Sequence, residues 1–164
     1  MMIENPRYDE GGYIIATLDG VQMVIPDDMG NRHRREIEEL GLTIAAYVPP
    51  PPTGEDVNAE RQRRIIDGAV FNGIHVTGRD EDIMNLTNLA LAAQVRIAGG
   101  DTTTLTTYRD GGNVDHDLTP AEVLGLWQQA SARVSAIYAA SWALKAMEPI
   151  PADYANDSYW GATQ

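Results

Sequence analysis

The stretch Tyr47-Val48-Pro49-Pro50-Pro51-Pro52-Thr53 divides the sequence into two parts. Proline lacks a backbone N–H and fixes φ, so four consecutive prolines can form neither the interior of a helix nor a central strand. We expect residues 47–54 to be an extended polyproline linker between a small N-terminal unit at 1–46 and a helix-rich unit at 55–148. Such linkers join ordinary domains, and they also suit an adaptor that holds two modules apart.

The composition disfavours several classes of partner. Of 164 residues, 12 are Lys or Arg and 24 are Asp or Glu, and the net charge of -12 argues against binding to nucleic acid or to an anionic membrane. Cysteine is absent, so we expect no disulfide and no thiolate–metal bond. The start, residues 1–5, lacks the features of a signal peptide, and we expect the protein to be made and kept in a cytoplasm.

The N-terminal unit begins with a predicted hairpin. Two β-rich runs flank Asp19-Gly20, a pair that tolerates the positive φ angles of a tight turn. Asn31 is placed to cap a short helix over 31–40, and residues 42–47 then form a third, short strand. A unit of this size is near the lower limit for independent folding, so we expect it to contact a partner surface.

The unit after the prolines has the pattern helix, hairpin, helix, hairpin and long helix, which makes the whole chain α+β. Asn72-Gly73 and the run 110–113 mark the two hairpin turns. The three helices are predicted at 55–67, 80–98 and 120–148. Apolar residues at helical spacing predict that these helices pack together. The residues expected to be buried are Ile83, Leu86, Ile97, Trp127, Val134 and Ile137.

The last predicted helix carries apolar residues at heptad spacing. This apolar seam consists of Val123, Trp127, Ala130, Val134, Ile137, Ser141 and Leu144. Further apolar residues outside the seam broaden the face, which favours packing within the domain. The spacing also fits a helical bundle between molecules, and hence a homo-oligomer.

No pattern of catalytic residues is found along the chain. The run Asp115-His116-Asp117 offers oxygen and nitrogen ligands. In a strand, however, alternate side chains point to opposite faces, so a solvated turn is expected there rather than a metal site. The sequence has no phosphate-binding glycine loop, no nucleophilic serine motif and no cysteine. We therefore expect no enzymatic activity, no bound metal and no cofactor.

Two segments are candidate protein-interaction surfaces. The predicted hairpin strands at 13–18 and 21–25 carry more apolar residues than one buried face needs. The irregular tail at 149–164 is aromatic, and we expect its aromatic residues to dock on another surface. The predicted contact residues are Ile14, Ile15, Leu18, Met23, Ile25, Tyr154 and Trp160.

The sequence between the prolines and the tail resembles a known family. The residues that carry the resemblance are Asn58-Ala59-Glu60-Arg61-Gln62-Arg63-Arg64-Ile65, the hairpin Phe71-Asn72-Gly73, and Ala143-Leu144-Lys145 at the end of the last helix. They are similar to the DUF4376 family, a phage-encoded domain of unknown function, over roughly residues 57–147. Members usually have a Trp near the start of the polar β segment, where this chain has Thr103-Thr104-Leu105.

The resemblance implies a structural or adaptor protein of a bacteriophage tail, at the tail tip or the base of a tail fibre. Such a protein is made in the host cytoplasm and carried in the virion, and its expected partners are other phage tail or fibre proteins. The alternative is a tail-fibre assembly chaperone that is not retained in the virion. The family has no assigned enzymatic activity, so it implies no catalytic residues.

Overall fold

The computed structural model describes residues 2–161, and the chain forms two compact units, Met1–Pro50 and Pro51–Gln164. The boundary falls within the four prolines, which cannot continue a helix or a sheet because they lack N–H donors. Each unit has its own hydrophobic core, and each combines helices with antiparallel strands. The chain is therefore α+β, as predicted.

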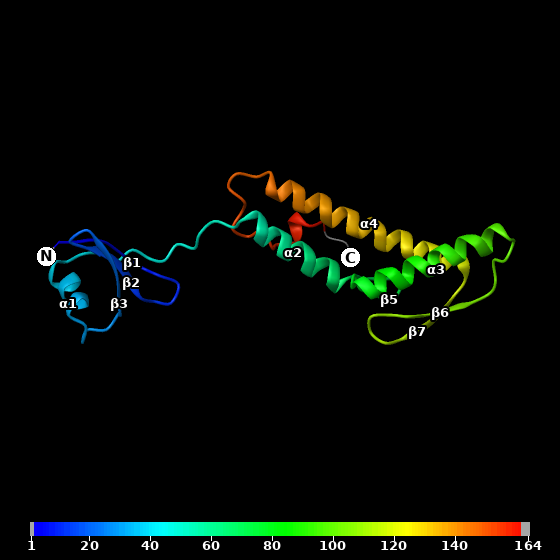
Figure 1. Cartoon of the computed structure of the whole chain (residues 1–164), viewed down its shortest axis with the longest axis horizontal. Helices are drawn as coiled ribbons and strands as arrows, with labels where there is room; N and C mark the ends of the chain where they lie inside the picture. Colours follow the sequence, from blue (N-terminus) through cyan, green and yellow to red (C-terminus); the bar gives the residue numbers. More distant parts are fainter. Residues whose placement is uncertain (1, 162–164) are drawn as a thin grey trace. The chain divides into compact units, whose positions relative to one another are not determined.

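A three-stranded antiparallel sheet and one helix make up the N-terminal unit (Figure 1). The elements are β1 (Ile3–Tyr8), β2 (Ile14–Leu18), β3 (Val21–Ile25) and α1 (Arg32–Glu39), and the strand order is β1-β2-β3. The turn between β2 and β3 lies at Asp19-Gly20, as predicted, with φ angles of 47° and 87°. Asn31 caps α1 by accepting hydrogen bonds from the backbone N–H groups of His33 and Arg34.

The structure differs from the prediction at the far edge of this sheet. β1 was not predicted, because it contains Pro6 and its pairing with β2 is irregular between Glu4 and Arg7. The predicted strand at 42–47 is wrong. It forms only an isolated parallel bridge between Arg7 and Ala45. The irregular edge of β1 offers matching donors and acceptors at this one position.

The C-terminal unit packs α2 and α3 along α4 and carries two hairpins (Figure 1). Its elements are α2 (Gly54–Asp67), β4 (Ala69–Phe71), β5 (Ile74–Val76), α3 (Asp80–Ala98), β6 (Thr106–Arg109), β7 (Asp115–Leu118), α4 (Pro120–Lys145) and the 3-10 turn η1 (Asp157–Tyr159). The hairpins β4–β5 and β6–β7 enclose the predicted turns. Thr53 and Thr119 are the N-caps of α2 and α4. Each forms a capping box with the acidic residue three positions on, Asp56 and Glu122 respectively.

The core of this unit confirms part of the predicted burial. Leu86 and Ile137 are buried, and Trp127 is half-buried. The prediction is wrong for Ile83 and Ile97, which are 43% and 37% exposed. Ile83 lies in the first turn of α3 beside an open cleft, and Ile97 lies in the last turn, where α3 extends past the beginning of α4 (Figure 1).

The apolar seam of α4 faces the inside of the unit. Val123, Ile137, Ser141 and Leu144 are buried, and the other seam residues are half-buried. Of the two interpretations of the heptad spacing, packing within the domain is therefore the one that accounts for this seam. α4 ends at Lys145, before the predicted residue 148. Glu148 precedes Pro149, a position that disfavours helical backbone angles.

Candidate interaction sites

Three of the predicted contact residues lie in the core of the N-terminal unit. Ile14, Leu18 and Ile25 are 0%, 5% and 1% exposed and pack with Ile3 and Ile37. The inner face of the sheet is covered by α1 and widened by β1, so it buries more apolar side chains than the hairpin alone could bury. The structure thus removes these three residues from the predicted contact surface.

The edge strand β3 nevertheless exposes apolar side chains. Among the described residues it pairs with β2 on one side only. Val21, Met23 and Val24 are 63%, 39% and 60% exposed, and the half-buried Ile15 lies opposite Val24. Of the predicted residues, Ile15 and Met23 remain accessible. Sequence analysis missed Val21 and Val24, although alternation along the strand, once Ile25 is placed inside, turns Val24 outward.

An edge strand of this kind can accept a strand from a partner. Its free N–H and C=O groups provide the hydrogen bonds of the added pairing, and its exposed side chains provide apolar contact. The strand β3 is therefore the candidate docking site of the N-terminal unit.

The two predicted tail residues, Tyr154 and Trp160, pack against their own unit. Trp160 is 3% exposed, and its Nε1 donates a hydrogen bond of 2.7 Å to the carbonyl of Tyr154. Both residues belong to a cluster with Val57, Ile137 and Leu144, so the tail covers the side of the core between α2 and α4. The two residues were predicted to contact another protein, but the structure packs them on their own unit and leaves Trp160 inaccessible to a partner.

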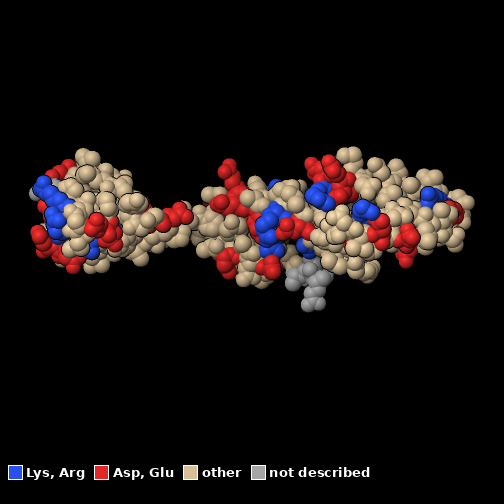
Figure 2. All heavy atoms as spheres, turned by 90° about the horizontal axis from the view of Figure 1, so that it is seen from below, with Lys and Arg blue, Asp and Glu red and all other residues tan. Residues whose placement is uncertain are grey.

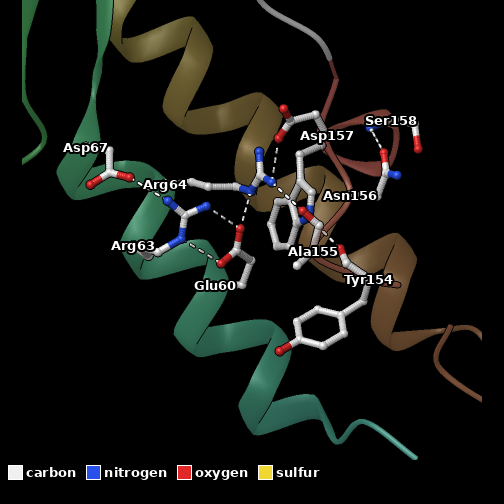
Figure 3. A network of polar contacts seen from close by, with 10 residues as sticks. Glu60, Arg63, Arg64, Asp67, Tyr154, Ala155, Asn156, Asp157 and Ser158 are labelled. Carbon is white, nitrogen blue, oxygen red and sulfur yellow. Dashed lines mark hydrogen bonds and ion pairs between the residues drawn. The ribbon is translucent and has the colours of Figure 1, made fainter. Parts of the chain in front are cut away.

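Arg64 of α2 holds the tail in place (Figure 3). Its Nη2 donates a 2.8 Å hydrogen bond to the carbonyl of Ala155 and lies 2.7 Å from Oδ1 of Asp157. The guanidinium also lies over the ring of Trp160, 5.0 Å from the centroid, which is the geometry of a cation–π contact. Arg64 is only 12% exposed, so water weakens these interactions less than it would on an open surface.

Arg63 and Arg64 of α2 pair with acids on the same helix (Figure 3). Nε of Arg64 lies 2.7 Å from Glu60, and Arg63 contacts both Glu60 and Asp67 at 2.6 Å. The hydrogen bond from Arg63 holds the pKa of Glu60 below its ordinary value, against the opposing effect of burial. Figure 2 likewise shows basic and acidic side chains interspersed on the face that it presents. This arrangement is typical of ion pairing within a domain.

A second polar cluster joins the two hairpins of the C-terminal unit. The buried carboxylate of Asp110 accepts hydrogen bonds from the backbone N–H of Val114 and Gly112, and it lies 3.0 Å from Nε2 of His116. The N–H of His75 also donates to it, at 3.3 Å. The Val114 hydrogen bond, followed by that of His116, holds the pKa of Asp110 far below its usual range.

The side chains of Asp115, His116 and Asp117 are held by separate partners. Asp115 pairs with Arg109, His116 with Asp110, and Asp117 accepts from the hydroxyl of Thr107. Within residues 2–161, no group of three His, Cys, Asp or Glu side chains is placed to hold a metal ion. None of the helices described there is long and apolar enough to cross a membrane.

An apolar cleft of about 310 Å³ opens between the end of α2, the β4–β5 hairpin, α3 and α4. Its walls include Val76, Ile83, Trp127 and Val134. Arg133 also lines the cleft, and burial, followed by the charge of Arg64, lowers its pKa. The lining is mostly aliphatic and aromatic, so the cleft is suited to an apolar side chain.

The chain is thus an α+β protein of two units. The N-terminal unit has an accessible edge strand, and in the C-terminal unit the segment after α4 packs against the core between α2 and α4. Comparison with family models matches residues 52–158, more than half of the chain, to the domain of unknown function DUF4376. The chain belongs to the DUF4376 family. Searches of curated proteins and of solved structures found no match.

Proposed function

We propose that this chain is a structural adaptor of a bacteriophage tail, at the tail tip or the base of a tail fibre, and that it acts by binding other tail or fibre proteins. The N-terminal unit docks on one partner through β3, and the helical unit presents a second surface beyond the prolines. In this function the chain needs no catalytic group, metal or cofactor.

The observation that carries this proposal is the exposed apolar edge of β3 on a unit with a separate core. Val21, Met23 and Val24 are exposed on a strand that has one free edge among the described residues. A polyproline connection adds about 3 Å per residue and resists bending, which suits a module that must reach a second protein.

The test uses particles of a phage or prophage that encodes the chain. Mass spectrometry of purified virions should detect the wild-type protein at a fixed ratio to the tail proteins. Replacement of Val24→Glu should strongly reduce this ratio, because a carboxylate would have to be desolvated at the docked edge. The matched control is Val70→Glu on β4, where the valine has a similar exposure of 58%.

The outcomes separate the proposal from its alternative. A protein that is needed for fibre assembly but absent from purified particles is a chaperone rather than a tail component. Incorporation of the Val24→Glu variant at the wild-type ratio would show that β3 is not the docking site.

A further inference from the structure

The edge of β3 that no described strand covers offers backbone hydrogen-bonding groups at two residues. The turn at Asp19-Gly20 is a two-residue loop, so Leu18 and Val21 form the hydrogen-bonded pair that closes it. Hydrogen-bonded and non-hydrogen-bonded pairs alternate along an antiparallel ladder. The backbone N–H and C=O groups of Gln22 and Val24 therefore point away from β2, toward the uncovered edge.

Pro26 ends this edge. It has no N–H to donate, and its carbonyl accepts a hydrogen bond of 2.9 Å from the N–H of Asp28. Between the turn and Pro26, an added strand thus finds two donors and two acceptors, those of Gln22 and Val24. A segment as long as β3, which has five residues, is enough to use all four groups.

The side chains beside this edge are apolar on both faces of the sheet. Val21 and Met23 lie on the same face as the buried Ile25, yet they are 63% and 39% exposed. On the other face, the exposed Val24 lies beside the half-buried Ile15. A strand added at the edge would cover apolar surface on both faces, so its own central residues should be apolar or β-branched.

Carboxylates stand at both ends of β3. Asp19 precedes the strand, and Asp27 and Asp28 follow it. Asp27 is paired with Arg34, at 2.7 Å. Asp19 and Asp28 instead accept hydrogen bonds from backbone N–H groups, which carry no net charge. Cationic side chains at the two ends of an added strand would therefore meet opposite charge.

A second copy of the chain would meet like charge instead. A two-fold contact of two β3 edges that uses all four groups pairs Gln22 with Val24 of the other copy, with the axis at Met23. The same register sets Asp19 opposite Asp27 of the other copy, twice, and like charges directly opposite one another destabilise a sheet. Each copy also carries a net charge of -12. The charges thus favour a strand of a different protein over a second copy.

We propose that β3 receives an extended segment of another protein that is apolar in its middle and carries Lys or Arg at both ends. The segment adds a strand to the sheet through the backbone groups of Gln22 and Val24, and its cations lie near Asp19 and Asp28. This inference rests on the proposed docking through β3, and it adds the chemistry of the partner.

The test titrates the full chain into fluorescently labelled peptides and follows their anisotropy. One peptide has the sequence Lys-Lys-Val-Thr-Val-Thr-Val-Lys-Lys, and the other has Glu in place of each Lys. The Lys peptide should bind about 10-fold more tightly or better at low salt, and the preference should shrink as salt screens the charges. A Lys peptide whose five central amides are N-methylated should bind about 10-fold more weakly or worse, because it cannot donate to the edge.

Protein variants locate the site. Val24→Pro removes an outward N–H and spares the pairing with β2, which edge strands tolerate, and it should weaken the Lys peptide about 10-fold or more. Asp19→Asn combined with Asp28→Asn keeps the side-chain acceptors but removes two charges, so it should weaken that peptide about 3- to 10-fold at low salt. The matched control, Glu81→Gln with Glu148→Gln, removes two charges from the C-terminal unit and should leave binding unchanged.

The possible results separate this inference from the proposed function. Equal binding of the Lys and Glu peptides, or binding that N-methylation of the peptide leaves intact, overturns the inference. A full chain that dimerises in sedimentation equilibrium and becomes monomeric on Val24→Pro shows that a second copy covers the edge, and this also overturns it. Each of these results leaves the proposed function to the measurement on virions, where loss of the Val24→Glu protein from particles would still support docking through β3.

Discussion

Replacement of Arg64→Ala should release the C-terminal tail and destabilise the helical unit. The substitution removes a charged hydrogen bond to the carbonyl of Ala155, worth about 1.5–3 kcal/mol, and a cation–π contact with Trp160, worth about 0.5–2 kcal/mol. The ion pair with Asp157 adds little, because that carboxylate is 84% exposed. Glu60 keeps Arg63 as a partner. The expected loss is therefore about 2–5 kcal/mol, out of a typical total of about 5–15 kcal/mol.

Two measurements check this expectation. Urea unfolding followed by far-UV circular dichroism gives the free energy of unfolding. Acrylamide quenching, in a background where Trp127 and Trp142 are replaced by Phe, reports the exposure of Trp160 alone. The Arg64→Ala variant should lose stability and show a quenchable Trp160, because the segment after α4 can detach while α2 and α4 stay packed.

Matched variants separate the charge of Arg64 from its bulk. Arg64→Met keeps an apolar stem above Trp160 but removes the hydrogen bonds, so it should fall between the wild type and Arg64→Ala. Arg63→Ala removes a neighbouring arginine that is 56% exposed, and it should change the unfolding free energy by less than about 1 kcal/mol. If Arg64→Ala and Arg63→Ala unfold at the same urea concentration with equally protected Trp160, the locking role of Arg64 is refuted.

Three further outcomes follow from the packing and the charges of the C-terminal unit. Gly78→Ala would place a Cβ 2.1 Å from the carbonyl oxygen of Ile65, so it should lower the free energy of unfolding by about 2 kcal/mol or more in urea titrations. Gly125→Ala, inside α4 with no atom within 4 Å of the new Cβ, should instead raise the melting temperature through a gain of about 0.5–1 kcal/mol. The pKa of Asp110 is lowered from 3.8, so its contribution to stability is complete above that value and is lost as the pH falls through the lower folded-state pKa. Stability measured from pH 6 downward should decline in acid, and Asp110→Asn should remove part of that decline; parallel curves for the two proteins would contradict this.

The sequence by itself determined the local elements. The tight turns of both hairpins require positive φ angles, which Asp19-Gly20 and Asn72-Gly73 tolerate and few other pairs do. Both hairpins were therefore predictable. The beginning of α4 was equally clear, because Thr119 and Glu122 satisfy free N–H groups within a few residues of one another. Four prolines placed the boundary between the units, since without N–H donors they cannot continue a helix or a sheet of either unit.

The tertiary structure alone decided which apolar residues face solvent. Ile14 and Val24 are both β-branched residues on neighbouring strands, yet one is 0% and the other 60% exposed. Alternation places the two residues on opposite faces of the hairpin, but only the position of β1 and α1 decides which face is covered. Trp160 is a similar case, because its burial depends on Arg64, which lies far from it in the sequence. Burial depends on contacts between distant segments, whereas turns and caps depend on the backbone angles and hydrogen bonds of a few adjacent residues.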